Sequence, residues 1–276
     1  MIKINLPDVL PPEIEEWTVR ALDITNEILA AATLEDKHRL IDRYNRHWRD
    51  AALIRWLSSM SFDKCWYTET KFGGDFQEVE HFRPKKNTKI NDGTLLVGHP
   101  GYYWLAFDLE NYRLCKRRLN LRKSTYFPVL DERFRALDEN HDWRDEHPLF
   151  LDPLDEEDHL LLSFNDDGKP VPADGLEDQD VLRVRFTIDK YHLDEEVLNR
   201  RREETWSTTR SLYNKYLHSM NKAKNASNGG VALRARAKEN LVQLKKLLEK
   251  SEEFSSVAKQ SLIKTNEPMA VRIASC

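Results

Sequence analysis

The chain has few cysteines and no long apolar run. Its three cysteines, Cys65, Cys115 and Cys276, are an odd number at unrelated spacings, which argues against a disulfide framework. No run of about 18 apolar residues occurs, and no basic stretch followed by an apolar one opens the sequence, so we predict neither a membrane span nor a secretory signal. We therefore expect a soluble protein of the reducing cytoplasm, with no membrane partner.

The chain as a whole also has no excess of positive charge. Charged residues make up 33% of the 276-residue chain, yet the formal net charge is −4, so any surface for a polyanion must be local. The sequence contains no glycine-rich phosphate loop and no internal repeat, which argues against a nucleotide-binding loop and against a repeat architecture. At this length the chain can bury a sizeable core, and disorder is not expected.

Helical periodicity marks the N-terminal part of the chain. After Pro11-Pro12, apolar residues recur at spacings of three and four from Ile14 to Ile28, and acidic residues occupy the first turn. Thr33 is the expected N-cap of a second helix, which we predict to continue to about Leu57. The first sixty residues therefore form a predicted helical pair.

The C-terminal part is predicted to be helical as well. Asp194 can cap a helix that runs to about Ala223, with two glutamates in its first turn. The stretch NASNGG then breaks the helix. A last helix presents a face of leucine and alanine between Leu233 and Leu248.

Between these ends the pattern is different. From Ser61 to about Pro128, short aromatic and β-branched runs alternate with turn residues, which predicts small strands. An acidic, loop-rich stretch follows, in which Asp167-Gly168 predicts a tight hairpin turn. We therefore predict an α+β fold that is mostly helical. Its predicted segments are N-terminal helices (1–60), a core with strands (61–130), a loop-rich acidic segment with a hairpin (131–190) and C-terminal helices (191–276).

Positive charge is concentrated within the predicted core. Residues 81–126 hold ten lysines and arginines against three acids, a net charge of +7 in a chain of −4. Such a segment suits a polyanion, because lysine and arginine near phosphates release condensed counterions. On charge alone, solvated basic loops are the better explanation of the segment. The cations expected to contact nucleic acid are Arg83, Lys85, Lys86, Arg117, Arg118 and Lys123.

The stretch EVEHFRPKK, residues 78–86, contains a pair of residues with chemical potential. A carboxylate next to a histidine at a strand end can place one side chain on a metal and the other on a water. Hydrolysis of a phosphodiester needs a general base with a pKa near 7 and a divalent cation that stabilises the developing charge. An isolated Glu80-His81 pair, however, is more often structural or incidental.

Several motifs follow one another in a fixed order. Between Lys64 and Pro128 these are KCWYTE, EVEHFRPK, HPGYYWLAFDLEN, then LN, Lys123 and YFP. This stretch resembles the HNH endonuclease family, in which a hairpin and a helix form a ββα-metal core. More narrowly, it resembles the PtuB-like proteins of Septu-type and retron-type antiphage systems. The similarity continues more loosely through HPLFLDPLDEEDH, RFTIDKYHLDEEVLNRRR and NEPMAVRI.

The resemblance implies a role for each matching residue. His81 is the general base that activates water, and Glu80 and Asn120 are the ligands of a single divalent metal. Asn111 braces the loop so that His81 keeps its orientation. Hard oxygen ligands of this kind favour magnesium or manganese over zinc. Taken singly, each asparagine also fits a turn or a helix cap.

A structural zinc is not expected, although many HNH proteins hold one between two Cys-x-x-Cys pairs. Here the first pair is Cys65 and Thr68, and the positions of the second pair are Lys116 and Leu119. One aligned cysteine cannot form a tetrahedral thiolate site, so we predict that hydrophobic packing holds the core together. The candidates for this packing are Phe62, Trp66, Tyr67, Trp104 and Leu119.

These features predict a metal-dependent endonuclease, with DNA as the favoured substrate and RNA, such as tRNA, as the other. The resemblance implies an antiphage effector with an ABC- or SMC-like ATPase partner of the PtuA-like type. In a retron system, a reverse transcriptase and its noncoding RNA or msDNA would be further partners. The alternative is a catalytically inactive nucleic-acid-binding or scaffold subunit, whose site decayed together with its zinc knuckle.

Overall fold

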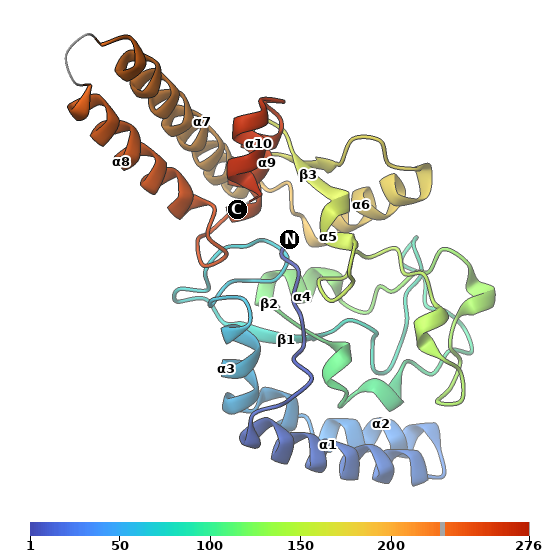
Figure 1. The fold of residues 1–276 in the computed structure, drawn as a ribbon. Coiled ribbons are helices and arrows are strands. Elements are labelled where there is room, and N and C mark those ends of the chain that lie inside the picture. The colour runs from blue at the N-terminus through green and yellow to red at the C-terminus, as the bar shows by residue number, and fades with distance from the viewer. Residues whose placement is uncertain (227–229, 276) are drawn as a thin grey trace.

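The computed structural model describes residues 1–226 and 230–275 of the chain. Helices dominate it, and its strands form two small antiparallel sheets of two strands each (Figure 1). The predicted α+β, mostly helical fold class is therefore confirmed. None of the helices in these ranges combines the length and the apolar character that crossing a membrane requires.

The first helix, α1 (Pro12–Ala30), forms as its sequence pattern predicts. Its buried residues are the five that the periodicity selects, from Ile14 through Trp17 to Ile28. Proline stands in its first turn, where the missing backbone N–H costs no hydrogen bond. The apolar face of α1 packs into the main hydrophobic core, so the local pattern and the tertiary packing agree.

The second predicted helix is divided in two. Thr33 caps α2 (Leu34–Arg43) as expected, and its hydroxyl accepts a hydrogen bond from a backbone N–H of the first turn at 3.1 Å. The helix ends well before Leu57, because Asp50 acts as a new N-cap and starts α3 (Ala51–Ser59). An aspartate that bonds to nearby backbone N–H groups competes with helix continuation. The prediction of a single long helix was therefore wrong.

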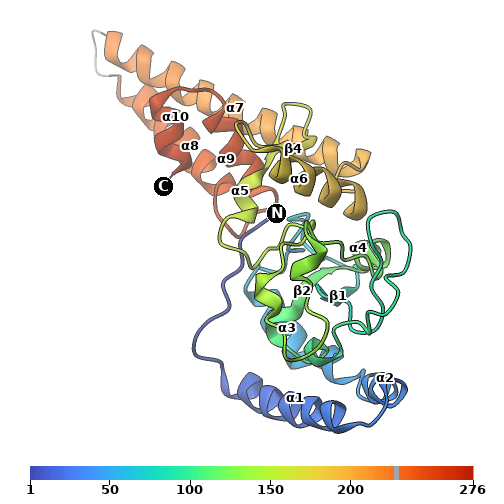
Figure 2. The same cartoon turned by 90° about the vertical axis from the view of Figure 1, so that its right-hand side faces the viewer.

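Two strands and a helix form the centre of the molecule. Strand β1 (Gln77–His81) pairs antiparallel with β2 (Tyr112–Lys116), from Gln77 opposite Lys116 to His81 opposite Tyr112. Helix α4 (Arg117–Lys123) follows β2 directly and packs against both strands. Figure 2 shows α4 beside the two strands. The local order is therefore strand, strand, helix.

Most of the aromatic residues expected to hold this region together are buried. Trp66 and Tyr67 are fully buried, and Trp104 and Leu119 are nearly so. Phe62 is 49% exposed and has a φ of 56°, so its predicted role in the packing was wrong. A left-handed backbone at this position places Phe62 in a turn after α3, where its ring does not enter the core.

The segment 131–190 contains more helix than its sequence suggests. The predicted turn is present, because β3 (Leu162–Phe164) pairs with β4 (Pro170–Pro172). Gly168 has a φ of 72°, and a Cβ atom there would lie 2.2 Å from the Asn199 carbonyl oxygen. A short helix, α5 (Asp158–Leu161), and the 14-residue α6 (Asp178–Tyr191) were not predicted. In α6, packing against α4 and β4 outweighs weak local propensity.

The C-terminal part is a helical hairpin with two short helices at its base. The long helices α7 (Glu196–Asn225) and α8 (Val231–Leu247) lie side by side and project from the rest of the molecule (Figures 1 and 2). Helices α9 (Ser255–Ile263) and α10 (Pro268–Ala274) follow and were not predicted. The predicted break in NASNGG falls largely on residues 227–229, which lie outside the described residues.

Two hydrophobic cores hold these parts. The main core joins buried side chains from Met1 to Val257, so the segments 1–60, 61–130 and 131–190 share one interior. A smaller core lies at the base of the hairpin, and its fully buried members include Leu244, Ala258 and Leu262. The boundaries at 60, 130 and 190 stay predictions about folding units, while the packing is continuous across them.

Candidate functional site

A cavity of about 680 Å³ lies beside the end of β1. His81 ends this strand, and its ring is held edge-on between Trp48 and Tyr112, with ring centroids 4.9 and 5.2 Å away. Five predicted site residues line the cavity together: His81, Lys85, Lys86, Arg117 and Asn120. The structure thus brings the predicted base, one predicted metal ligand and three predicted phosphate contacts to one place.

The His81 ring is fixed in one tautomer. Its Nε2 lies 2.9 Å from the backbone carbonyl oxygen of Ala106, which can only accept a hydrogen bond. In the neutral ring Nε2 therefore carries the proton, and Nδ1 keeps its lone pair. Nδ1 lies 3.4 Å from the Nζ atom of Lys85, which lines the same cavity. The Lys85 ammonium group can donate to this lone pair, and both residues line the cavity.

The charge states of the two side chains follow from their surroundings. Burial lowers the pKa of His81 well below its ordinary value, and Lys85 and Lys123 act in the same direction. At neutral pH the ring is neutral and able to accept a proton. Burial also lowers the pKa of Lys85 to about 8, helped by Lys123, Lys86 and Arg49 and opposed by Asp42. Lys85 is therefore charged at pH 7 and loses its charge in mildly alkaline solution.

Asn111 holds the loop that follows His81. Its Oδ1 accepts a hydrogen bond from the Arg83 backbone N–H at 2.7 Å, and its Nδ2 donates to the carbonyl oxygens of Arg83 and Leu105. Its own carbonyl oxygen accepts from the Phe82 backbone N–H at 2.8 Å. Three of these four bonds fix the chain directly after His81, and the fourth joins it to Leu105.

Helix α4 faces the side of β1 that carries two glutamates. Asn120 Nδ2 donates to Glu78 Oε2 at 2.8 Å, and the Lys123 ammonium group lies 3.2 Å from Glu80 Oε1. Glu78 and Glu80 are two residues apart on a strand, and therefore on the same face. Asn120 and Lys123 are three apart on a helix, and therefore on neighbouring turns. The strand spacing and the helix spacing therefore place Asn120 opposite Glu78 and Lys123 opposite Glu80.

Glu78 is a site residue that sequence reasoning missed. It lines the cavity with His81 and Asn120, whereas Glu80 is 1% exposed and lies beneath it, where its Oε1 accepts from the Tyr191 hydroxyl at 2.7 Å. The strand alternation in EVEH placed both glutamates on one face, and this signal was available in the sequence. The HNH resemblance directed attention to Glu80 alone.

The two ligands predicted for a divalent cation are placed differently. Asn120 lines the cavity, whereas Glu80 does not line it and pairs with Lys123. Within the described residues, no three His, Cys, Asp or Glu side chains form a metal-binding group. Glu80 Oε2 is buried and has no hydrogen-bond partner, and such an atom is costly unless something binds it. Carboxylate and carboxamide oxygens are the donors that Mg²⁺ and Mn²⁺ prefer.

The two cysteines near the positions of the missing zinc knuckle are buried. Cys65 and Cys115 are free thiols with no exposed surface. Burial raises the pKa of the Cys115 thiol well above its ordinary value, and the negative charge of Glu80 adds to this. The region around it packs as a hydrophobic core.

Two cations expected at the nucleic-acid surface lie inside the protein. Arg83 is 4% exposed and bonds to the Glu146 carboxylate at 2.7 Å. Lys123 has no exposed surface and donates to the backbone carbonyl oxygens of His81 and Phe82, each at 2.7 Å. Each cation is already engaged by acceptors of the protein, so we remove both from the expected nucleic-acid contacts.

The other predicted contacts lie at the surface but have acidic partners. Lys86 pairs with Asp42 at 2.6 Å, Arg117 with Glu78 at 3.5 Å, and Arg118 with Glu195. These pairs offset much of the +7 charge counted along the sequence. Surface ion pairs of this kind are weak and exchange readily with other anions, so the three cations remain available to phosphate.

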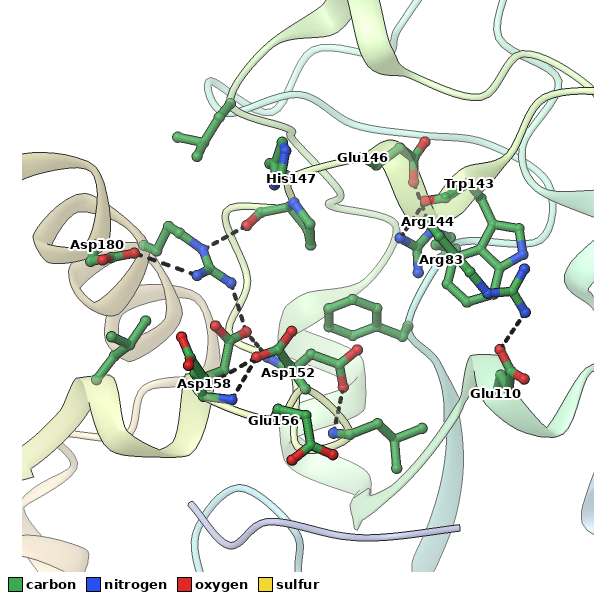
Figure 3. Close-up of a pocket in the computed structure, with 18 of the residues that line it drawn as sticks. Arg83, Glu110, Trp143, Arg144, Glu146, His147, Asp152, Glu156, Asp158 and Asp180 are labelled. Carbon is green, nitrogen blue, oxygen red and sulfur yellow. Dashed lines mark hydrogen bonds and ion pairs between the residues drawn. The ribbon is translucent and has the colours of Figure 1, made fainter. Parts of the chain in front are cut away.

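A larger cavity, of about 1310 Å³, lies elsewhere and has the opposite character (Figure 3). Nine acidic residues line it against four lysines and arginines. Figure 3 shows Arg83 beside Glu146 and Trp143, and Arg144 bonded to Glu110. An acidic lining repels phosphate. The cavity at His81 is therefore the candidate site, although its volume is the smaller of the two.

Residues of β1, of α4 and of the loop after β1 thus line one cavity with a neutral histidine, a carboxamide, a carboxylate and a partly buried lysine. A neutral histidine can accept a proton, and a lysine ammonium group can bind an anion.

Comparisons with known proteins show a similarity over part of the chain. No model of a known protein family matches the chain. The chain is similar to Septu protein PtuB of Bacillus mycoides (strain KBAB4), with 34% identity over 123 residues. That match covers 44% of this chain and 41% of the relative, so the chain spans less than half of the curated protein. The PtuB-like relationship is supported over this stretch.

The buried Lys123–Glu80 pair predicts a large effect on stability. Lys123→Met leaves the Glu80 carboxylate buried without its counter-charge, which we expect to lower the free energy of unfolding by about 3–5 kcal/mol. The double variant with Glu80→Gln should recover part of this loss. Urea denaturation followed by circular dichroism measures both. Lys116→Met, which breaks the surface pair with Asp75, is the control and should cost less than about 1 kcal/mol. Equal midpoints for the two single variants would contradict the structural role of Lys123.

Proposed function

We propose that the protein is a metal-dependent endonuclease of the HNH type that hydrolyses phosphodiester bonds of nucleic acid. The observation that carries the proposal is the His81 ring. It is held neutral, with Nε2 bonded to the Ala106 carbonyl oxygen and Nδ1 toward a cavity that Asn120 and Lys85 also line. The similarity to a Septu PtuB protein supports the same proposal. DNA is the favoured substrate, and RNA is the other.

In this proposal each side chain has one task. His81 Nδ1 accepts the proton of the attacking water, while the Ala106 carbonyl oxygen stabilises the resulting imidazolium through Nε2–H. The Lys85 ammonium group binds a phosphate oxygen, and pairing with that phosphate draws it away from Nδ1. Asn111 keeps the base in position through its four backbone bonds.

A divalent cation completes the proposed site. When bound, it stabilises negative charge on the scissile phosphate and on the leaving oxygen. Glu80 and Asn120 would hold it, as the HNH resemblance implies, and the unpartnered Oε2 of Glu80 supports this. Glu78 is a further candidate, because it is bonded to Asn120 at the cavity.

The partners are proposed from the relative. The name Septu protein PtuB places that relative in a Septu system. We propose that this chain likewise acts as an antiphage effector together with a PtuA-like ATPase. The alternative of an inactive scaffold subunit predicts the same association without cleavage.

Cleavage assays test the proposed base. Plasmid DNA and total RNA are incubated with the protein in Mg²⁺ or Mn²⁺, with and without the ATPase. We expect His81→Ala to lower the cleavage rate by about 10²- to 10⁴-fold, the usual contribution of a general base. His141→Ala changes an exposed histidine that pairs only with Asp138 and should leave the rate unchanged. Unaltered cleavage by His81→Ala would eliminate this base, and no cleavage in any pairing would favour the scaffold.

Manganese binding tests the proposed ligands apart from activity. The fraction of Mn²⁺ bound is measured by electron paramagnetic resonance for wild type, Asn120→Ala and Glu78→Gln. Asn120→Ala should weaken binding by about tenfold or more, as loss of a ligand does. Loss of Mn²⁺ binding in Glu78→Gln as well would identify Glu78 as a ligand. Retained binding would leave this role to Glu80, and wild-type affinity in Asn120→Ala would refute the site.

The charge of Lys85 predicts a pH dependence. Its pKa is lowered to about 8, so the wild-type protein loses this positive charge as the pH rises through 8. Lys85→Arg remains charged throughout. We therefore expect the ratio of wild-type to Lys85→Arg cleavage rates, at low substrate concentration, to fall between pH 7 and 9. A ratio independent of pH would show that Lys85 does not bind the substrate phosphate.

A further inference from the structure

The outer part of the α7–α8 hairpin, residues 207–247, is a second basic region of the molecule. We call it the arm. It holds nine lysines and arginines against one acid, Glu239, a net charge of +8 in a chain of −4. The arm projects from the body of the protein (Figures 1 and 2), and none of its residues lines the His81 cavity. None of its cations is among the predicted nucleic-acid contacts, which all lie between Arg83 and Lys123.

Lys86, Arg117 and Arg118 near His81 have acidic partners, whereas the described cations of the arm do not. Eight of the nine are exposed, and Arg210 is partly covered. Among the described residues, no acidic side chain forms an ion pair with any of them. The nine are Arg210, Lys215, Lys222, Lys224, Arg234, Arg236, Lys238, Lys245 and Lys246.

The cations also recur along the two helices. Lys215 and Lys222 lie seven residues apart on α7, which places them on one face about 10 Å apart. On α8, Arg234, Lys238 and Lys245 follow at spacings of four and seven and share a face. The 30-residue α7 is about 45 Å long. Charges are therefore repeated along an extended rod, as the phosphates of a double helix are.

The remaining surface of the arm does not suit a protein partner. Within its described part, the large apolar side chains that are exposed are Val231 and Val242. Protein interfaces have an apolar, aromatic-rich centre and are depleted in lysine. Interfaces with nucleic acid are polar and strongly positive. The composition of the arm matches the second kind.

We propose that the arm binds the phosphate backbone of double-stranded nucleic acid, without reading its sequence, and anchors the substrate outside the catalytic cavity. The substrate role rests on the proposed nuclease function, whereas the binding itself does not. The shared ligand chemistry is a regular double row of phosphates, which duplex DNA and duplex RNA both provide. The positive charges along this rod repel one another, which destabilises the folded arm, and a bound polyanion would reduce this repulsion.

Binding is measured in the His81→Ala protein with EDTA, so that no cleavage interferes. Fluorescein-labelled duplexes of DNA and of RNA, each of roughly 30 base pairs, are titrated by anisotropy between about 50 and 300 mM KCl. The arm variant carries Lys215→Gln, Lys222→Gln, Arg234→Gln and Lys238→Gln. The control variant removes four exposed cations outside the arm: Arg20→Gln, Arg46→Gln, Lys169→Gln and Arg185→Gln. Circular dichroism verifies that both variants retain their helical content.

The arm variant should bind at least one duplex about tenfold or more weaker than the control variant. Its plot of log affinity against log salt should be less steep by about 3 to 4, close to 0.9 for each lost contact. Equal affinities and slopes for the two variants would overturn the proposal. So would an arm variant that binds both duplexes normally but no longer associates with the ATPase. Arm-dependent binding without cleavage by the wild-type protein would instead refute the nuclease function alone.

Discussion

The buried ammonium group of Lys123 is the interaction on which the candidate site depends. It lies at the end of α4 and bonds to the carbonyl oxygens of His81 and Phe82, and it pairs with Glu80. These contacts join the helix to the end of β1, where His81 is located. Without a cation there, two carbonyl groups and a carboxylate would face one another in a buried space at high cost. The position of His81 relative to Asn120 therefore depends on Lys123.

Several cations in residues 81–126 are buried in ion pairs that stabilise the fold and are not exposed to a ligand. Arg83 and Arg113 are buried and bond to Glu146 and Asp152, and both flank the His81 loop. A count along the sequence cannot separate such cations from exposed ones, because it ignores the acids that folding brings to them. The +7 of residues 81–126 therefore overstates the positive charge that a substrate meets, while the arm presents nearly all of its charge to solvent.

Local signals were predictable from the sequence, and contacts between distant residues were not. The buried face of α1, the Thr33 cap and the turn at Gly168 depend on a few neighbouring residues, and each was found. The helix α6 was missed because packing stabilises it, and the Asp50 cap was missed although it bonds to backbone N–H groups two and three residues further on. In the candidate site, the HNH resemblance pointed to His81, which lines the cavity, whereas Glu78 needed the strand alternation to be matched with the helix spacing of α4.

A nuclease site makes two opposed demands on local charge. Cations attract the phosphate backbone, but cations beside a histidine lower its pKa and weaken it as a base. The fold separates these demands only in part. Beyond the effect of burial, Lys85, which lies 3.4 Å from Nδ1, and the buried Lys123 lower the pKa of His81. Among the described residues, the cations of the arm form no ion pair with an acid, and no residue of the arm lines the His81 cavity. Under the proposed function, the arm can therefore add affinity for a long polyanion without lowering the pKa of His81 further, whereas Lys85 links phosphate binding to that pKa.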